Sequence, residues 1–136
     1  MSAAAVSEEI EKSNSWSNVA LWIVQLGVAA MFLMAGGAKL SGDPMMAATF
    51  EKIGVGQWFR YLTGSLEIAG ALGLLTPFAS GAAALGLVFV MIGAVASHIL
   101  ILGGTFVPAL VLLVASALIA YGRRDQLVSL LRRNSK

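Results

Sequence analysis

The sequence contains no cysteine, and only 12% of its 136 residues are charged. The absence of cysteine excludes disulfides, thiol redox chemistry, thiolate metal sites and a cysteine nucleophile, and with them the small membrane enzymes that work through paired thiols. A water-soluble domain carries roughly 25% charged residues. With 58% hydrophobic residues, this chain has too little charge to cover a water-facing surface, so we expect its apolar side chains to face a lipid bilayer.

Several motifs of known chemistry are also missing. The net charge is only +2, and no basic stripe interleaved with aromatic residues is present, which excludes nucleic-acid binding. There is no G-x-G-x-x-G, phosphate-binding loop or H-E-x-x-H motif, and no nucleophile–base pair is recognisable. The sequence therefore favours a protein that is not an enzyme, and it offers no catalytic residue.

Four apolar segments predict an all-α fold, an integral membrane antiparallel four-helix bundle. The expected transmembrane spans are about residues 19–38, 61–78, 81–102 and 106–121, within a membrane domain of residues 19–122. The first has roughly the 20 residues that a bilayer requires, and the second is near the short end of the range. The tight connectors 76–80 and 102–105 predict that the last three spans are sequential antiparallel neighbours.

The segments outside the spans are expected to be polar or to lie on the membrane surface. After Pro44, apolar residues at helical spacing predict a short interfacial helix between the first two spans. Residues 1–18 form a polar N-terminal tail that is net acidic, unlike the basic start of a secretory signal. Residues 123–136 predict a basic amphipathic tail on an anionic membrane surface, and a frayed, solvated tail is the alternative.

The distribution of lysine and arginine predicts the orientation. Four spans place both termini on the same side of the membrane. That side carries Lys12, Arg123, Arg124, Arg132, Arg133 and Lys136, and the opposite side carries Lys39, Lys52 and Arg60. Because cytoplasmic loops are richer in these residues, we expect both termini in the cytoplasm and a multi-pass protein of the plasma or inner membrane.

Four polar side chains are predicted to converge in the outer half of the bilayer. Glu67 lies seven residues, about 10 Å along a helix, inside Arg60, and His98 lies about 9 Å from the outer end of its span. Arg60 and Glu67 share one helix face, and Lys39 ends the first span on the same side. Lys39, Arg60, Glu67 and His98 are therefore the candidates for ligand binding or proton exchange.

Two interpretations of these residues stay open at this stage. In the structural one, Glu67 pairs with Lys39, Arg60 or His98 only to fix helix register, and His98 is an ordinary hydrogen-bonded interior histidine. In the functional one, Glu67 and His98 form a proton-accepting pair beside a bound ligand, since intramembrane ionisable residues are functional candidates by default. His98 is the only histidine, so neither a metal nor haem is expected.

Three motifs stand out by their order and spacing. They are Ala35-Gly36-Gly37-Ala38-Lys39-Leu40, the stretch from Gly64 to Leu75 followed by Pro77, and the stretch from Met91 to His98. In these motifs the chain resembles the DoxX-like family of small four-helix membrane proteins. The resemblance covers about residues 26–122 and implies an antiparallel four-helix bundle. It also implies that Lys39, Glu67 and His98 occupy the polar motif positions of the family.

The resemblance leaves several functions in view. Some members are subunits of quinone-reducing or terminal-oxidase systems, and others are membrane accessory proteins or chaperones. A quinone-associated or redox-complex accessory subunit is the leading hypothesis; any electron carrier would then belong to a partner in a larger membrane complex. The alternatives are a structural or assembly subunit without ligand chemistry and a small proton-coupled exporter. A homo-oligomer is compatible with each of these functions. A shared fold does not by itself transfer an activity, so the resemblance does not decide between them.

Overall fold

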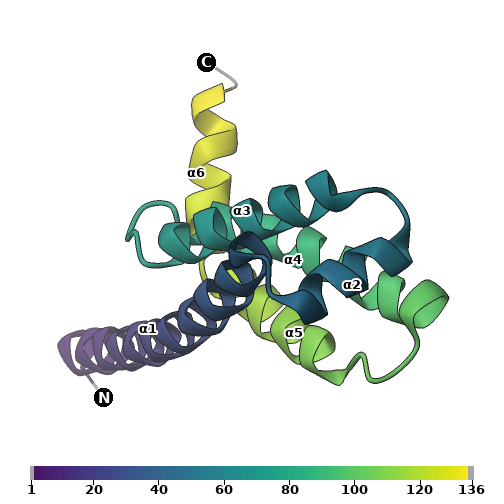
Figure 1. Ribbon diagram of the computed structural model, residues 1–136. Coiled ribbons are helices and arrows are strands. Elements are labelled where there is room, and N and C mark those ends of the chain that lie inside the picture. Colours follow the sequence, from purple (N-terminus) through teal and green to yellow (C-terminus); the bar gives the residue numbers. More distant parts are fainter. Residues whose placement is uncertain (1, 135–136) are drawn as a thin grey trace.

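The computed structural model describes residues 2–134, with the side chains of residues 12–14 and 134 excepted. All regular structure in this part of the chain is helical, which confirms the predicted fold class at that level (Figure 1). The elements are α1 (Ala3–Ser41), α2 (Pro44–Ile53), α3 (Gln57–Leu74), α4 (Ser80–Ser97), the π-helical turn η1 (His98–Leu102), α5 (Val107–Gly122) and α6 (Arg124–Asn134).

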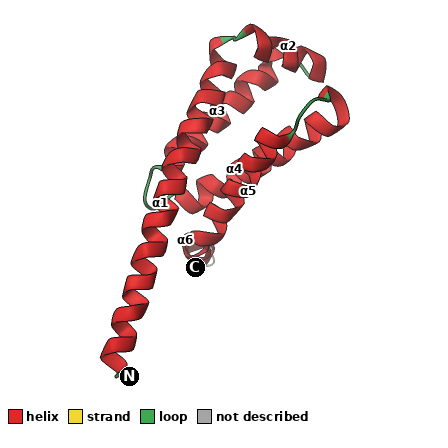
Figure 2. Ribbon diagram, turned by 90° about the horizontal axis from the view of Figure 1, so that it is seen from below, coloured by secondary structure: helices red, strands yellow, loops and turns green. Residues whose placement is uncertain are grey.

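The helices pack as two pairs. α1 packs mainly on α3, α4 packs mainly on α5, and contacts between α3 and α4 join the pairs. Figure 2 shows the pairs spreading apart toward α2, while they meet near the start of α6. We call these the α2 end and the α6 end. The N-terminal half of α1 projects beyond the other helices (Figures 1 and 2).

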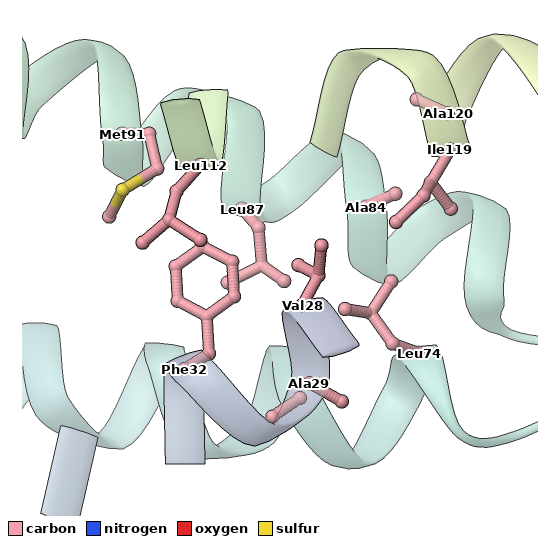
Figure 3. Packing of buried hydrophobic residues seen from close by; sticks show 11 residues of the cluster. Val28, Ala29, Phe32, Leu74, Ala84, Leu87, Met91, Leu112, Ile119 and Ala120 are labelled. Atoms are coloured by element: carbon pink, nitrogen blue, oxygen red, sulfur yellow. The ribbon is translucent and has the colours of Figure 1, made fainter. Parts of the chain in front are cut away.

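An apolar core holds the two pairs together. It contains Val28, Ala29, Phe32, Ala71, Leu74, Ala84, Leu87, Met91, Leu112, Ile119 and Ala120. Figure 3 shows the Phe32 ring of α1 directed toward Leu112 of α5 and Leu87 of α4. Phe32 is fully buried, so its ring bridges the two pairs.

Two of the described helical stretches, α1 and Ser80–Leu102, are long and apolar enough to cross a membrane. A third joins them if α5 and α6, which meet at a 61° bend, are counted as one broken span. The 18-residue α3 carries Arg60 and Glu67, and α5 alone is 16 residues, about 24 Å, long. These features explain why fewer than the four predicted spans stand out by length and composition.

Two helices begin earlier than the predicted segments. The polar tail expected over residues 1–18 is mostly the first part of α1. The segment expected at 61–78 corresponds to α3, which lies about one turn earlier because Gly56, with φ of 118°, precedes its first residue. The tail expected at 123–136 is helical as α6. The side chain of Lys12, and residues 1, 135 and 136, lie outside the described part of the chain.

Candidate functional site

A close backbone approach of α1 and α3 positions the first two candidate residues. A Cβ on Gly36 would lie 2.8 Å from the Gly64 carbonyl oxygen, and a Cβ on Gly64 would lie 3.0 Å from the Cβ of Lys39. Only glycine at both positions permits this separation, as in close helix crossings generally. Lys39 follows Gly36 by one turn and Glu67 follows Gly64 by one turn, so the crossing brings these two side chains together.

Lys39 and Glu67 form a buried ion pair. The Lys39 Nζ lies 3.0 Å from Oε1 and 3.2 Å from Oε2 of Glu67. The Glu67 side chain is 2% exposed and the Lys39 side chain 14%. Of the three partners considered for Glu67 from the sequence, the structure therefore selects Lys39. Both charges are withdrawn from the surroundings and compensate each other, which a buried charge requires.

Arg60 lies next to this pair but makes other contacts. It is 5% exposed, and its Nη1 donates a hydrogen bond to the Lys39 carbonyl oxygen at the end of α1. Its Nε donates to the Gln57 Oε1 at 2.7 Å, and its guanidinium carbon lies 4.4 Å from the Tyr61 ring centroid. Arg60 thus binds one of the carbonyl groups that the end of a helix leaves unpaired. It fixes the backbone of Lys39 rather than contacting Glu67.

His98 lies where α4 changes into the π-helical turn η1. Its Nδ1 lies 3.5 Å from the Gly103 carbonyl oxygen, and the residue is half-buried. No hydrogen bond or ion pair links it to Glu67 among the described contacts. The described contacts include no hydrogen bond to the Nε2 of this imidazole, and His98 lies on the wall of a cavity.

A cavity of about 690 Å³ lies at the α2 end between the two helix pairs. Its walls are mostly apolar and come from α1, α2, α3, α4, η1 and α5. The polar or charged residues on its walls are Lys39, Thr49, Thr63, Glu67, Ser97 and His98. Three of the four predicted site residues therefore line one cavity. Arg60 is not on its wall but donates a hydrogen bond to the Lys39 carbonyl oxygen. The volume falls in the range of small-molecule sites, about 300–1,000 Å³.

Helix α2 covers the cavity at its wide end. Met46 and Phe50 contribute to the wall from this helix. The Lys52 Nζ donates to the Leu102 carbonyl oxygen of η1 at 3.1 Å, and the Gln57 Nε2 donates to the Ala47 carbonyl oxygen at 2.9 Å. These bonds tie α2 to η1 on one side and to α3 on the other, so the helix spans the space between the two helix pairs.

A second polar network at the α6 end has no counterpart among the predicted site residues. Gln25 is fully buried; its Nε2 donates to the Leu74 carbonyl oxygen at 2.7 Å and its Oε1 accepts from the Arg123 Nε at 2.8 Å. Arg123 also donates to the Asn18 Oδ1 at 2.8 Å. Burial lowers the pKa of the Arg123 guanidinium, although arginine remains charged at any physiological pH.

Gln126 of α6 completes this end. Its Oε1 accepts from the Gly81 backbone N–H at 2.9 Å, and its Nε2 donates to the Pro77 carbonyl oxygen at 2.8 Å. The side chain thus caps the start of α4 and fixes the connector before it. From the sequence, Gln25 is a polar residue in an apolar span and Arg123 a surface charge. In the sequence, a glutamine within an apolar span is the one signal that could have pointed to this network.

The arrangement at the α2 end can bind a ligand that needs both donors and acceptors. The Lys39 ammonium donates and the Glu67 carboxylate accepts, yet the pair has no net charge. The His98 imidazole can donate or accept according to its tautomer. Thr63 and Ser97 already donate their hydroxyl groups to carbonyl oxygens of their own helices, so they present only acceptor lone pairs to the cavity.

The fold and the buried ion pair define an all-helical membrane protein with a polar centre between its helices. A profile of the DoxX-like family matches residues 23–120, most of the chain. The chain therefore belongs to the DoxX-like family, which confirms the predicted resemblance. No curated protein and no solved structure matches the chain significantly.

Proposed function

We propose that this protein crosses the plasma or inner membrane four times and binds a quinone-type ligand in the cavity at the α2 end, as an accessory subunit of a redox complex. The observation that carries the proposal is the meeting of Lys39, Glu67 and His98 on the walls of one mostly apolar cavity. A quinone needs a hydrogen-bond donor, an acceptor and an apolar slot, and this cavity offers each of them.

The exposed surface supports four membrane crossings. Only 11% of the most apolar stretch of Ser80–Leu102 is buried inside the protein, so most of its side chains need lipid around them. α3 packs mainly against α1, and α5 mainly against α4. Once α1 and α4 cross the bilayer, their partners lie at the same depth. The charges that make α3 less apolar, Arg60 and Glu67, are buried inside the protein.

The electrostatics favour a neutral head group. The Lys39–Glu67 pair carries no net charge, so it offers an anion no excess attraction, whereas a carbonyl oxygen can accept from the Lys39 Nζ without separating strong charges. A hydroxyl group of the reduced form can donate to the Glu67 carboxylate. The same pair can therefore serve both oxidation states of a quinone, with His98 available on the opposite wall.

Binding can be tested with the purified full chain in lipid nanodiscs and a water-soluble, tail-less dimethoxy-methyl-benzoquinone as the probe. We expect saturable binding that Glu67→Gln weakens at least about tenfold, the equivalent of one charge-assisted hydrogen bond of about 1.4 kcal/mol. Glu51→Gln is the matched control, because Glu51 is exposed on α2 outside the cavity. Binding that is absent, or equal in both variants, would refute the proposed function.

The ion pair also supports a second candidate, a structural or assembly subunit. Lys39 and Glu67 already satisfy each other, and the pair fixes the register of α1 against α3 without any ligand. In that case Glu67→Gln lowers the stability of the protein and the yield of its complex. The double variant Lys39→Gln/Glu67→Gln separates the two. Restored stability and complex yield, with no quinone binding by the wild-type protein, favours the structural role. Quinone binding by the wild-type protein that a stable double variant has lost favours the ligand site.

A further inference from the structure

We infer that the cavity opens sideways to the bilayer through a seam between α3 and α4, and that its ligand is a membrane-dissolved amphiphile whose apolar tail remains in this seam. The inference rests on the proposed function and deepens it. It names the route by which the ligand reaches the polar centre and the class of ligand, a neutral hydrogen-bonding head group on a long apolar tail.

The seam is closed near the α6 end and widens toward the α2 end. A Cβ on Gly70 would lie 2.5 Å from a Leu87 methyl group, and one on Gly73 would lie 2.6 Å from the Ala83 Cβ. At these positions α3 and α4 are therefore in tight contact. One to two turns further toward α2, residues of both helices line the cavity.

The cavity walls at the widened seam are also part of the outer surface. Phe89 of α4 is 66% exposed, and Leu62 and Leu66 of α3 are 44% and 47% exposed, yet all three line the cavity. Gly93, one turn beyond Phe89, is an exposed wall residue as well. A residue that faces both the cavity and the surroundings marks an opening, and every residue at this opening is apolar or glycine.

The other boundaries are better closed. Phe32, Met91 and Leu112 of the core form the floor (Figure 3). α2 covers the top and is held to η1 by Lys52. The remaining exposed wall residues are Met45 at the start of α2 and Pro108 at the start of α5. They mark the alternative route, from the aqueous side under the edge of α2.

The seam and the polar centre together define the ligand. An apolar opening that faces lipid offers no hydrogen bond to a hydrated solute, but it admits a hydrocarbon chain without a desolvation cost. A head group that passes through it reaches Lys39, Glu67 and His98. Because the ion pair is neutral overall, we expect a neutral head group rather than a phosphate. A tailed quinone meets both conditions, and an anionic phospholipid meets only the first.

The route can be tested with a benzoquinone that carries a decyl tail with a terminal photoreactive diazirine, in nanodiscs containing the full chain. We expect cross-links on Leu62, Leu66 or Phe89. Leu66→Trp should fill the seam and weaken binding of the tailed probe about tenfold through lost packing of the tail, while the tail-less probe keeps its affinity within a factor of about two. Met45→Trp, at the other rim, tests the alternative route and should not weaken the tailed probe selectively. Ile92→Trp, at an exposed position of α4 that does not line the cavity, is the control and should leave both probes unaffected.

The outcomes separate this inference from the proposed function. Cross-links at Met45 or Pro108, a selective effect of Met45→Trp, or equal weakening of both probes by Leu66→Trp would overturn the lateral route while Glu67-dependent binding stands. If the tail-less probe shows no Glu67-dependent binding, the proposed function itself fails. A thermal melt of each variant shows whether the tryptophan, placed on an exposed side chain, leaves the fold intact. A variant that melts early is replaced by Leu62→Trp, to which the same criteria apply.

Discussion

At the scale of single residues, burial of the Lys39–Glu67 pair costs free energy and also restricts the register in which α1 and α3 can pack. Removing two charges from water is expensive, and their attraction offsets this only when the geometry is good. Distances of 3.0 and 3.2 Å to the two carboxylate oxygens meet that condition. Such a pair contributes little net stability compared with apolar residues, but it penalises any helix register that separates its members.

This balance predicts a non-additive effect on stability. Lys39→Gln or Glu67→Gln alone should lower the free energy of unfolding by about 3 kcal/mol, because each leaves one buried charge without its partner. The double variant should lose clearly less than the sum. Denaturant titration of the four proteins in detergent measures the coupling. Strictly additive losses would show that the two side chains do not interact.

The glycine crossing predicts a contrast between two adjacent residues. Gly36→Ala places a Cβ 2.8 Å from the Gly64 carbonyl oxygen, and relief of such overpacking costs about 1–3 kcal/mol. A Cβ on Gly37 meets nothing within 4 Å, so Gly37→Ala should be neutral or slightly stabilising, since alanine is the better helix former. Melting temperatures of the two variants test this, and equal values would contradict the close crossing.

Gln25 predicts a cost at the α6 end. Gln25→Leu leaves the Leu74 carbonyl oxygen and the Arg123 Nε without their buried partner, and each unsatisfied group costs about 1–3 kcal/mol. Asn18→Ala is the milder comparison, because the bond from Arg123 to Asn18 is exposed. In denaturant unfolding, the Gln25→Leu variant should have a clearly lower free energy of unfolding than the Asn18→Ala variant. The reverse order would exclude a supporting role for the glutamine.

At the scale of elements, α2 and α6 attach to the two ends of the helix pairs by side-chain bonds to backbone groups. Lys52 and Gln57 tie α2 in place, and Gln126 ties α6 to the start of α4. Gly42 and Gly54, both with positive φ, bound α2. These hydrogen bonds hold the two short helices against the helix pairs.

The docking of α6 can be weakened at one side chain. Gln126→Ala removes the cap of α4 and should lower stability by about 0.5–2 kcal/mol. It should also increase proteolytic cleavage within α6, because this helix loses its bonds to Gly81 and Pro77. Ser129→Ala, an exposed position on the same helix, is the control. Unchanged cleavage in both variants would show that other contacts hold α6.

At the scale of the whole molecule, the proposed four crossings place α2 on one side of the membrane and both ends of the chain on the other. The absence of cysteine makes this simple to test, since a single introduced cysteine is the only reactive thiol. In intact cells, an impermeant maleimide should label Lys52→Cys and should fail to label Ser7→Cys or Ser129→Cys until the membrane is permeabilised. Labelling of all three before permeabilisation would exclude this topology.

Much of this protein follows from its sequence. Scarce charge and long apolar runs predicted an all-helical membrane protein, and the spaced glycine, lysine and glutamate motifs predicted the DoxX-like family; both are confirmed. The same reasoning grouped Lys39, Arg60, Glu67 and His98 from helix direction and depth, because the 1.5 Å rise of a helix fixes depth along the axis. Their role in ligand binding or proton exchange stays a prediction. The four crossings and the orientation remain predictions.

The tertiary structure decided what depth cannot specify, namely which side chains touch. The Gly36–Gly64 crossing selects Lys39 as the partner of Glu67 and directs Arg60 to a backbone carbonyl. The spreading of the two helix pairs leaves a cavity between Glu67 and His98 instead of a direct bond. Which side chains of neighbouring helices meet, and how far apart the helices lie, depends on the packing of distant residues, and a pattern along one helix does not specify either.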